Sequence, residues 1–323
     1  MTLNNRQALL LGKAVGDALG AVVETAKPED AAAYVKGYLR PLACPKDGVF
    51  TRPFGQYTDD TQMARELILS VAENGGTFDP KYTAKHWAAF ITSGRLTGGG
   101  RTTEDAAKSL QNGTPWDKAG NPRPSNGSAM RAAVTALLST KQDELKHIAT
   151  LQSQITHTAP EAIAASVMMA LGAWQCLHHK KLDKTHFLEA LATATADITP
   201  QSTEQLERLD GLIRQSPSTV MESLYYTLDL APEWRKYPGI SVHATEATLW
   251  ALYAFLKYPD DYMAAVSTAI SGGGDTDTTA AMAGALSGAY LGLDAIPSIY
   301  TDIIHDNGDW QADKLAQLVA DLS

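Results

Sequence analysis

Two short stretches place acidic and hydroxyl side chains at the start of predicted helices. In QYTDDTQMA, Asp59 and Asp60 are adjacent, and in SGGGDTDTT, Asp275 and Asp277 are two residues apart. Such residues are favoured helix caps and suit the helix dipole, but capping needs only one or two acids. Residues two apart lie on roughly opposite sides of a helix, so Asp275 and Asp277 face one point only if Asp275 precedes the helix.

The chemistry that these residue types suit is the binding of hard cations. Mg²⁺ and Mn²⁺ take oxygen ligands in octahedral arrangements, and threonine hydroxyls can serve beside carboxylates. Without metal, clustered carboxylates would repel one another and some would have to protonate, whereas two divalent ions would nearly balance five negative charges. The sequence therefore predicts a binuclear site. Its candidate residues are Glu24, Asp59, Asp60, Asp275 and Asp277, with the hydroxyls of Thr58 and Thr278.

Three glycines, Gly272 to Gly274, precede the second acidic stretch. Glycine allows backbone amides to approach an anion closely, and a phosphate beside a helix N-terminus is well placed electrostatically. The alternative interpretation is a flexible loop. Because the triplet runs into a metal-type sequence, we expect it to lie close to a bound phosphate or sugar.

Composition narrows the class of protein. The 323 residues carry a formal net charge of −9 without a basic cluster, which argues against nucleic acid as a partner. Cys44 and Cys176 lack metal-ligand spacing, and two distant cysteines do not make a disulfide framework. The apolar run near the N-terminus is too short for a signal peptide, and no run reaches the length of a membrane span. We expect a cytoplasmic protein.

The elements that must position the acidic residues are helices. Apolar residues repeat at helical spacing nearly throughout, and alternating strand patterns are scarce. This predicts an all-α fold in one domain over residues 1–323, because no composition break marks a boundary. Two Gly- and Pro-rich parts, 25–57 and 94–126, are expected to be irregular loops that bind a ligand. The main helices are expected at 61–76, 163–179, 244–258, 260–271 and 278–292.

Four stretches in order give the chain a specific resemblance: GKAVGDALGAVVE, YTDDTQMA, SNGSAMRAA and SGGGDTDTTAAMAGALSGAYLG, with ITHTAPEA as a weaker fifth. They resemble the ADP-ribosylglycohydrolase family. The resemblance implies a compact all-α fold whose cleft holds two Mg²⁺ or Mn²⁺ ions. It also implies hydrolysis of the bond between ADP-ribose and an acceptor such as a protein side chain, with ADP-ribose as product.

The resemblance also assigns roles to residues. It implies metal binding by Thr58, Asp59 and Asp60 on one side and by Asp275, Asp277 and Thr278 on the other, with Asp277 as the bridge. It implies contacts to the ADP-ribose, or a place lining the cleft, for Glu24, Gly98, Gly99, Gly100, Asn126, Gly127, Ser128, Met130, His157, Ser271, Gly272 and Gly273. Asn126, Ser128 and His157 also have a simpler interpretation as caps or structural hydrogen-bonding groups.

One position departs from the family pattern. Relatives that regulate nitrogenase commonly carry an acid before the paired threonines of the cleft loop, where this sequence has Arg101. An arginine beside the leaving group is an awkward neighbour for a cationic guanidinium. Arginine is our first expectation for the acceptor, and serine, another amino acid and a nucleic acid stay open. The general base also stays open among Glu24, Asp60 and Asp275.

Two other functions fit parts of the sequence. An all-α isoprenoid synthase also uses aspartate-rich helices with Mg²⁺, but its usual DDxxD motif is incomplete in DDTQM and aromatic residues make up only 7%. A non-catalytic ADP-ribose-binding protein on the same fold is the other alternative. Release of ADP-ribose from a modified protein, with and without chelator, distinguishes the three.

Overall fold

The computed structural model describes residues 1–46, 48–236 and 238–322. These residues are predominantly helical, and outside the helices their backbones pair only in isolated bridges such as Gln56 with His305. The all-α prediction is confirmed. That residues 1–323 form a single domain stays a prediction.

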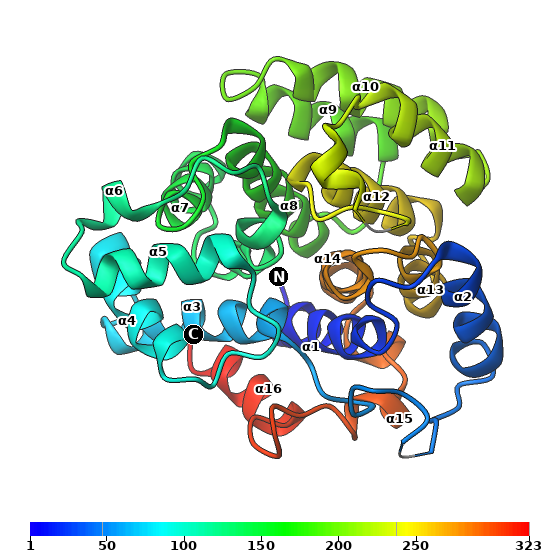
Figure 1. Cartoon of the computed structure of the whole chain (residues 1–323), viewed down its shortest axis with the longest axis horizontal. Helices are drawn as coiled ribbons and strands as arrows, with labels where there is room; N and C mark the ends of the chain where they lie inside the picture. The colour runs from blue at the N-terminus through cyan, green and yellow to red at the C-terminus, as the bar shows by residue number, and fades with distance from the viewer. Residues whose placement is uncertain (47, 237, 323) are drawn as a thin grey trace.

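Two helices, α1 and α14, lie side by side at the centre of the molecule (Figure 1). The longer helices are α1 (Leu3–Ala21), α3 (Asp59–Glu73), α4 (Pro80–Thr92), α5 (Arg101–Gln111), α7 (Gln142–Gln154), α8 (Pro160–His178), α9 (Lys184–Thr195), α10 (Gln201–Leu212), α11 (Pro217–Thr227), α12 (Ala244–Lys257), α13 (Tyr262–Ser271), α14 (Thr276–Leu291) and α16 (Ala312–Ala320). Shorter ones are α2 (Pro28–Tyr34), α6 (Trp116–Ala119) and α15 (Ser298–Thr301), with a π-helical turn at Val35–Leu39 and 3₁₀ turns at Asn126–Ser128, Ala132–Leu137, Pro232–Arg235 and Leu293–Ala295.

Small residues every four positions allow α1 and α14 to approach closely. A Cβ atom on Gly16 would lie 2.2 Å from the carbonyl oxygen of Ala280, and one on Gly20 would lie 2.3 Å from that of Thr276. Gly12 faces the backbone of Gly284 in the same way. Because rising numbers on α1 meet falling numbers on α14, the helices are antiparallel. The end of α1 therefore lies beside the start of α14.

Two sequence-based expectations need correction. The parts expected to be irregular, 25–57 and 94–126, contain α2 with its π-helical turn and the whole of α5. Neither start has a side-chain cap hydrogen bond: Lys27 is the N-cap of α2 and Gly100 that of α5. Pro28 at the first position of α2 is nevertheless a start signal that the sequence offered. The helix expected from residue 61 begins two residues earlier, so Asp59 and Asp60 lie in the first turn of α3.

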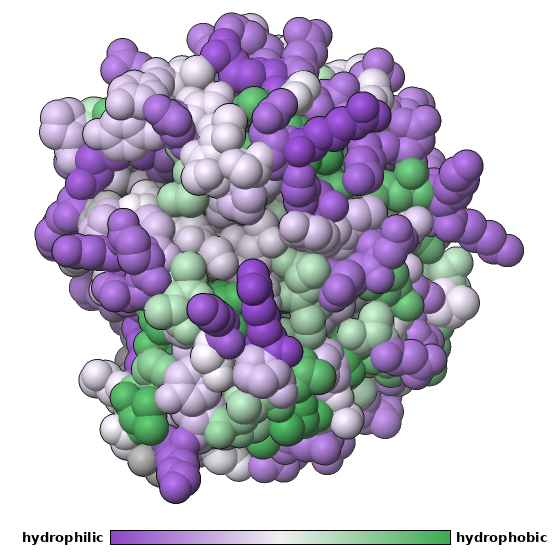
Figure 2. Space-filling view, turned by 90° about the vertical axis from the view of Figure 1, so that its right-hand side faces the viewer, coloured by the Kyte–Doolittle hydropathy of each residue, from purple (hydrophilic) through white to green (hydrophobic). Residues whose placement is uncertain are grey.

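The outer surface is mixed. Figure 2 shows hydrophilic residues over the upper half of one face and hydrophobic residues reaching the surface in its lower half. Among the described residues, no helix has the length and apolar character needed to cross a membrane. Cys44 and Cys176 are both free, with Cys44 exposed and Cys176 buried.

Candidate metal centre

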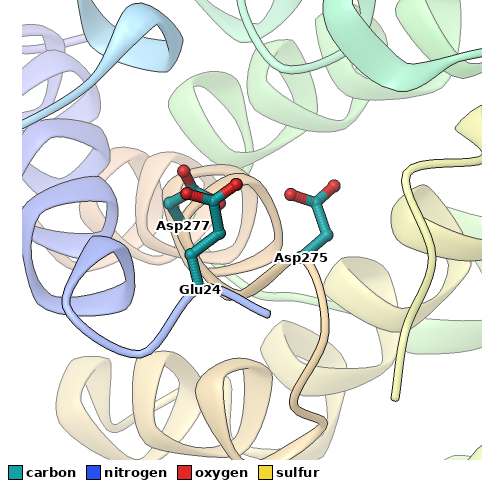
Figure 3. A group of neighbouring side chains, drawn as sticks. All are labelled: Glu24, Asp275 and Asp277. Carbon is teal, nitrogen blue, oxygen red and sulfur yellow. The ribbon is translucent and has the colours of Figure 1, made fainter. Parts of the chain in front are cut away.

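Glu24, Asp275 and Asp277 come together where α1 ends and α14 begins. Glu24 lies in the turn after α1, Asp275 is the N-cap of α14, and Asp277 is in its first turn. One carboxylate oxygen of each lies within 4.8 Å of the others. Figure 3 shows the three carboxylates pointing to the same side of the backbone. Asp275 precedes the helix, as the spacing of the two aspartates predicted, so both can face one point.

The start of α3 supplies the second group of acidic residues. Asp59 and Asp60 are buried in its first turn, and Thr58 is its N-cap. The hydroxyl of Thr278 on α14 donates to Asp60 Oδ2 at 3.2 Å, which joins the two helix starts directly. The structure therefore brings both acidic stretches, 218 residues apart in the chain, into one cluster.

Burial dominates the electrostatics of this cluster. It raises the pKa of Asp59, Asp60 and Asp277 well above the ordinary value, and neighbouring carboxylates raise each further. Burial also raises the pKa of Asp275 to about 6, although a hydrogen bond from Asn126 opposes that shift. Without a cation, a cluster of this kind favours protonated carboxyls.

The donor set fits divalent cations. Asp60 Oδ1 is buried and has no hydrogen-bond partner among the described residues, although Lys13 Nζ lies 3.9 Å away. A buried oxygen without a partner is costly unless something else coordinates it. Carboxylate and hydroxyl oxygens are the ligands that Mg²⁺ and Mn²⁺ prefer. The unpartnered oxygen and the close carboxylates thus suit the ions that the sequence predicted.

Two buried cations beneath the cluster, Lys13 and Arg131, were not expected from the sequence, in which Arg131 could be a surface ion-pair donor. Lys13 is completely buried on α1, donates to the carbonyl of Met130 at 2.7 Å, and has its pKa lowered by burial. Arg131 is completely buried, stacks on the ring of Trp87 at 4.0 Å, and burial lowers its pKa to about 9 while Asp59 opposes the shift. These positive charges partly offset the carboxylates. A charged residue within an otherwise apolar helix was the signal available for Lys13.

Asp17, one turn after Lys13 on α1, was also missed. It is completely buried and accepts hydrogen bonds from residues at the start of α3. The sequence offered the same signal, an acid between glycines in an apolar helix.

The glycine triplet does not present amides to an anion. The amides of Gly272 and Gly273 donate to carbonyls of α13, and that of Gly274 donates to Ala26 at 2.9 Å. Cβ atoms on these glycines would strike Trp250, the backbone at residues 26–28 and the backbone of Ile240. The glycines therefore serve close packing behind the site. Ser271 is the last residue of α13, and its hydroxyl donates to the Ser267 carbonyl.

The loop at 126–130 contacts the cluster through Asn126, whose side-chain amide donates to Asp275. Ser128 and His157 are completely buried, so their side chains support this loop from behind instead of lining a cavity. Ser128 accepts hydrogen bonds from Ser153 and Ser166. A Cβ on Gly127 would lie 2.9 Å from the His157 ring, which explains the glycine. Met130, also in this loop, is buried.

His157 is held in its neutral form. One ring nitrogen lies 2.7 Å from the Thr156 hydroxyl and the other 3.0 Å from that of Ser125. Burial, helped by the positive charge of Arg131, lowers the pKa of His157 well below its usual range.

The remaining predicted residues, Gly98 to Arg101, lie in the loop before α5 and at the start of that helix. A Cβ on Gly98, which has a φ of +84°, would lie 3.3 Å from Asp59 Oδ1, so this loop runs over α3. Gly99 packs on Leu96, Gly100 caps α5, and Arg101 begins that helix and is exposed.

Glu24 is more accessible than the aspartates of the cluster. Its side chain is 31% exposed and forms an ion pair of 2.6 Å with Arg52, which is 34% exposed. Glu24 therefore lies between the buried carboxylates and the solvent.

Comparisons with known proteins agree with one another. The family profile described as ADP-ribosylglycohydrolase matches residues 2–323. The human ADP-ribosylhydrolase ARH3 is 28% identical over 81% of this chain and 77% of its own length. The ADP-ribosyl-[dinitrogen reductase] glycohydrolase of Rhodospirillum rubrum is also 28% identical, over 89% of this chain and 86% of its own.

A bacterial relative and a solved structure extend this finding. The ADP-ribosylarginine hydrolase Tri1 of Pseudomonas putida (strain GB-1) is 27% identical over 99% of this chain and 78% of its own length. A solved structure titled ADP-ribosylglycohydrolase-related protein complex superposes with a TM-score of 0.69 and 27% identity. It covers 99% of this chain and 97% of its own.

Proposed function

This chain belongs to the ADP-ribosylglycohydrolase family, and we propose that it removes ADP-ribose from arginine side chains of modified proteins in a reaction that needs two divalent cations. It is a glycosidic-bond hydrolase of the ADP-ribosylhydrolase kind. Family membership argues against an isoprenoid synthase. Arginine as the acceptor, the need for two divalent cations and a cytoplasmic location are proposals.

The observation that carries the proposal is the cluster of carboxylates from α3, α14 and the turn after α1. Thr58, Asp59 and Asp60 would hold the cations from one side, and Asp275, Asp277 and Thr278 from the other. Bound Mg²⁺ or Mn²⁺ would lower the pKa of a coordinated water and orient it. Asn126 would fix the orientation of Asp275 through its hydrogen bond.

The proposed reaction is attack of water on the anomeric carbon of the ribose. The bond between this carbon and the acceptor nitrogen breaks, and charge develops on the sugar as in glycoside hydrolysis generally. Glu24 is our choice for the base that takes the proton of the water, because it is the half-exposed carboxylate of the cluster. Asp60 and Asp275 remain the other candidates. The leaving guanidine nitrogen takes up a proton as it departs.

Arginine as acceptor is supported by the name of one relative and opposed by one residue. The Pseudomonas relative is named an ADP-ribosylarginine hydrolase, and the Rhodospirillum relative acts on dinitrogen reductase. Arg101, exposed at the start of α5, would disfavour a cationic acceptor nearby. A serine linkage is therefore the direct competitor in the experiment.

The test incubates the purified protein with arginine-linked and serine-linked ADP-ribosyl peptides, each with Mn²⁺ or with excess chelator. We expect release of free ADP-ribose from the arginine peptide with Mn²⁺, and little release with chelator. Faster release from the serine peptide would contradict the acceptor. Undiminished release in chelator would contradict the metal site. ADP-ribose binding without any release would indicate a non-catalytic binding protein.

A further inference from the structure

Asp17 occupies a place that neither the family comparison nor the proposed reaction explains. Its carboxylate is completely buried on α1 and receives four hydrogen bonds from two residues of another segment. Thr58 donates to Oδ1 through its backbone N–H at 2.9 Å and through its hydroxyl at 2.8 Å. Thr61 donates to Oδ2 through its backbone N–H at 2.9 Å and through its hydroxyl at 2.6 Å.

These bonds replace the usual cap of α3. An N-cap side chain normally accepts a hydrogen bond from the backbone N–H three residues later. Thr58 is the N-cap of α3, but its side chain makes no such bond. Asp17 accepts from Thr61 N–H instead, so a residue of a different helix caps α3. The hydroxyl of Thr58 then points toward α1.

The two residues held by Asp17 enclose Asp59 and Asp60 in the chain. Fixing Thr58 and Thr61 to α1 fixes the turn that carries both aspartates. Because α1 packs its backbone directly on α14, the same contact sets the distance between Asp60 and Asp277. Cation affinity depends on ligand positions within a few tenths of an ångström.

We propose that Asp17 is a positioning residue, which caps α3 from α1 and so presents the acidic turn of α3 to the cations. This inference rests on the proposed metal site for its consequence, but the capping itself does not depend on metal. Asp17 does not contact the cations in this proposal; it acts through Thr58, one of the proposed metal ligands, and through Thr61.

The principal variant is Asp17→Asn. The asparagine keeps the shape of the side chain, but one acceptor oxygen becomes an NH₂ donor that faces either Thr58 or Thr61, both of which donate. Substituting a residue that orients a metal ligand typically lowers metal affinity 10–100-fold. We therefore expect the Kd for Mn²⁺ to rise at least ~10-fold. We also expect faster amide hydrogen exchange in the peptide that covers residues 58–64, in the absence of metal.

The matched control is Asp79→Asn. The exposed Asp79 caps α4 by accepting from the N–H groups of Lys81 and Tyr82, and it follows the end of α3 that is opposite the acidic turn. This variant makes the same Asp-to-Asn change at a helix N-cap, where asparagine caps as well as aspartate, so it should leave the Kd for Mn²⁺ and the exchange of residues 58–64 unchanged. A second variant, Thr61→Val, removes one hydroxyl donor and keeps the branched shape, and it should give a smaller loss of the same kind.

The outcomes separate this inference from the proposed function. A folded Asp17→Asn protein with wild-type exchange at residues 58–64 and wild-type Mn²⁺ affinity overturns the inference. If Asp17→Asn does not fold, unchanged exchange and affinity in Thr61→Val overturn it. If the wild type binds no Mn²⁺, the proposed metal site fails, and hydrogen exchange alone decides whether Asp17 caps α3.

Discussion

At the scale of single residues, the ionised carboxylates at the two helix starts would be unfavourable without a cation, because they are buried and repel one another. Asp59, Asp60 and Asp277 are buried beside one another, and burial raises the pKa of each. Lys13 and Arg131 supply positive charge from the protein side. The remaining negative charge and the unpartnered oxygen of Asp60 are what divalent cations would satisfy.

The first prediction separates metal ligation from capping. We expect Asp275→Ala and Asp277→Ala to abolish release of ADP-ribose while changing metal-free stability little, because removing either acid relieves repulsion. The control is Asp261→Ala at the start of α13, where Asp261 accepts from Ala264 N–H. Losing that cap should cost about 1 kcal/mol and leave activity intact.

Melting temperature without metal and ADP-ribose release with Mn²⁺ are the paired measurements for these three variants. Substantial activity in Asp275→Ala and Asp277→Ala, together with a clear loss of metal-free stability, would mean that these aspartates are only caps.

The second prediction concerns the buried His157. Its pKa lies well below 6.5 in the folded protein. Below about pH 6.5 the unfolded chain therefore binds a proton on this histidine that the folded chain does not bind. The stability that wild type gains from this residue is therefore lost as the pH falls below about 6.5. We expect the difference in free energy of unfolding between wild type and His157→Gln to shrink from pH 7.5 to pH 5. Urea titrations at both pH values measure it, and a constant difference would refute the buried neutral histidine.

At the scale of elements, α5 begins beside the loop that runs over Asp59, and its first residue is the exposed Arg101. We predict that Arg101→Asp shifts the ratio of kcat/KM values toward arginine-linked over serine-linked ADP-ribosyl peptides, because a negative charge attracts the guanidinium. Lys108→Asp on the same helix makes the same change of charge two turns away and should leave the ratio unchanged. A ratio that does not move in Arg101→Asp would remove this residue from acceptor selection.

The contact between α1 and α14 depends on the absence of side chains. A Cβ on Gly16 would lie 2.2 Å from a backbone oxygen of α14, and backbone cannot move aside as a flexible side chain can. We predict that Gly16→Ala lowers the free energy of unfolding by about 1–3 kcal/mol, as overpacking does, and weakens Mn²⁺ binding as the two helices separate.

Gly211→Ala is the matched control for that substitution. Gly211 is exposed on α10, and a Cβ there would meet nothing within 4 Å. Alanine is the better helix former, so this variant should be neutral or more stable by up to ~1 kcal/mol. Denaturant unfolding of both variants is the measurement. Equal stability of Gly16→Ala and wild type would contradict the close approach of the helices.

At the scale of the whole molecule, stability and cation binding should be linked through pH. The folded carboxyls whose pKa is raised, such as Asp275 at about 6, bind protons that the unfolded chain releases near pH 4. Their contribution to metal-free stability is thus present at low pH and lost as the pH rises through the folded pKa. A cation takes the place of those protons, so its effect should grow with pH.

We therefore predict that saturating Mn²⁺ raises the melting temperature more at pH 8 than at pH 5.5. Thermal scans with Mn²⁺ and with chelator at each pH measure the increment, and NaCl at equal ionic strength controls for screening. The same increment at both pH values would mean that the carboxylates do not exchange protons for the ion.

The sequence alone determined the helical class, the two acidic helix starts and the family resemblance, because these depend on residue types at short spacing. It did not reveal that α2 and α5 are helices, because the glycine and proline residues beside them are typical of loops, although Pro28 at the first position of α2 is itself a start signal. It did not assign Asp17 or Lys13, and it expected the glycine triplet to present amides to an anion, because the roles of all three depend on partners far along the chain. Only the packing of α1 against α14 and α3 decides which polar groups are buried together, because contacts between distant segments follow from the whole fold.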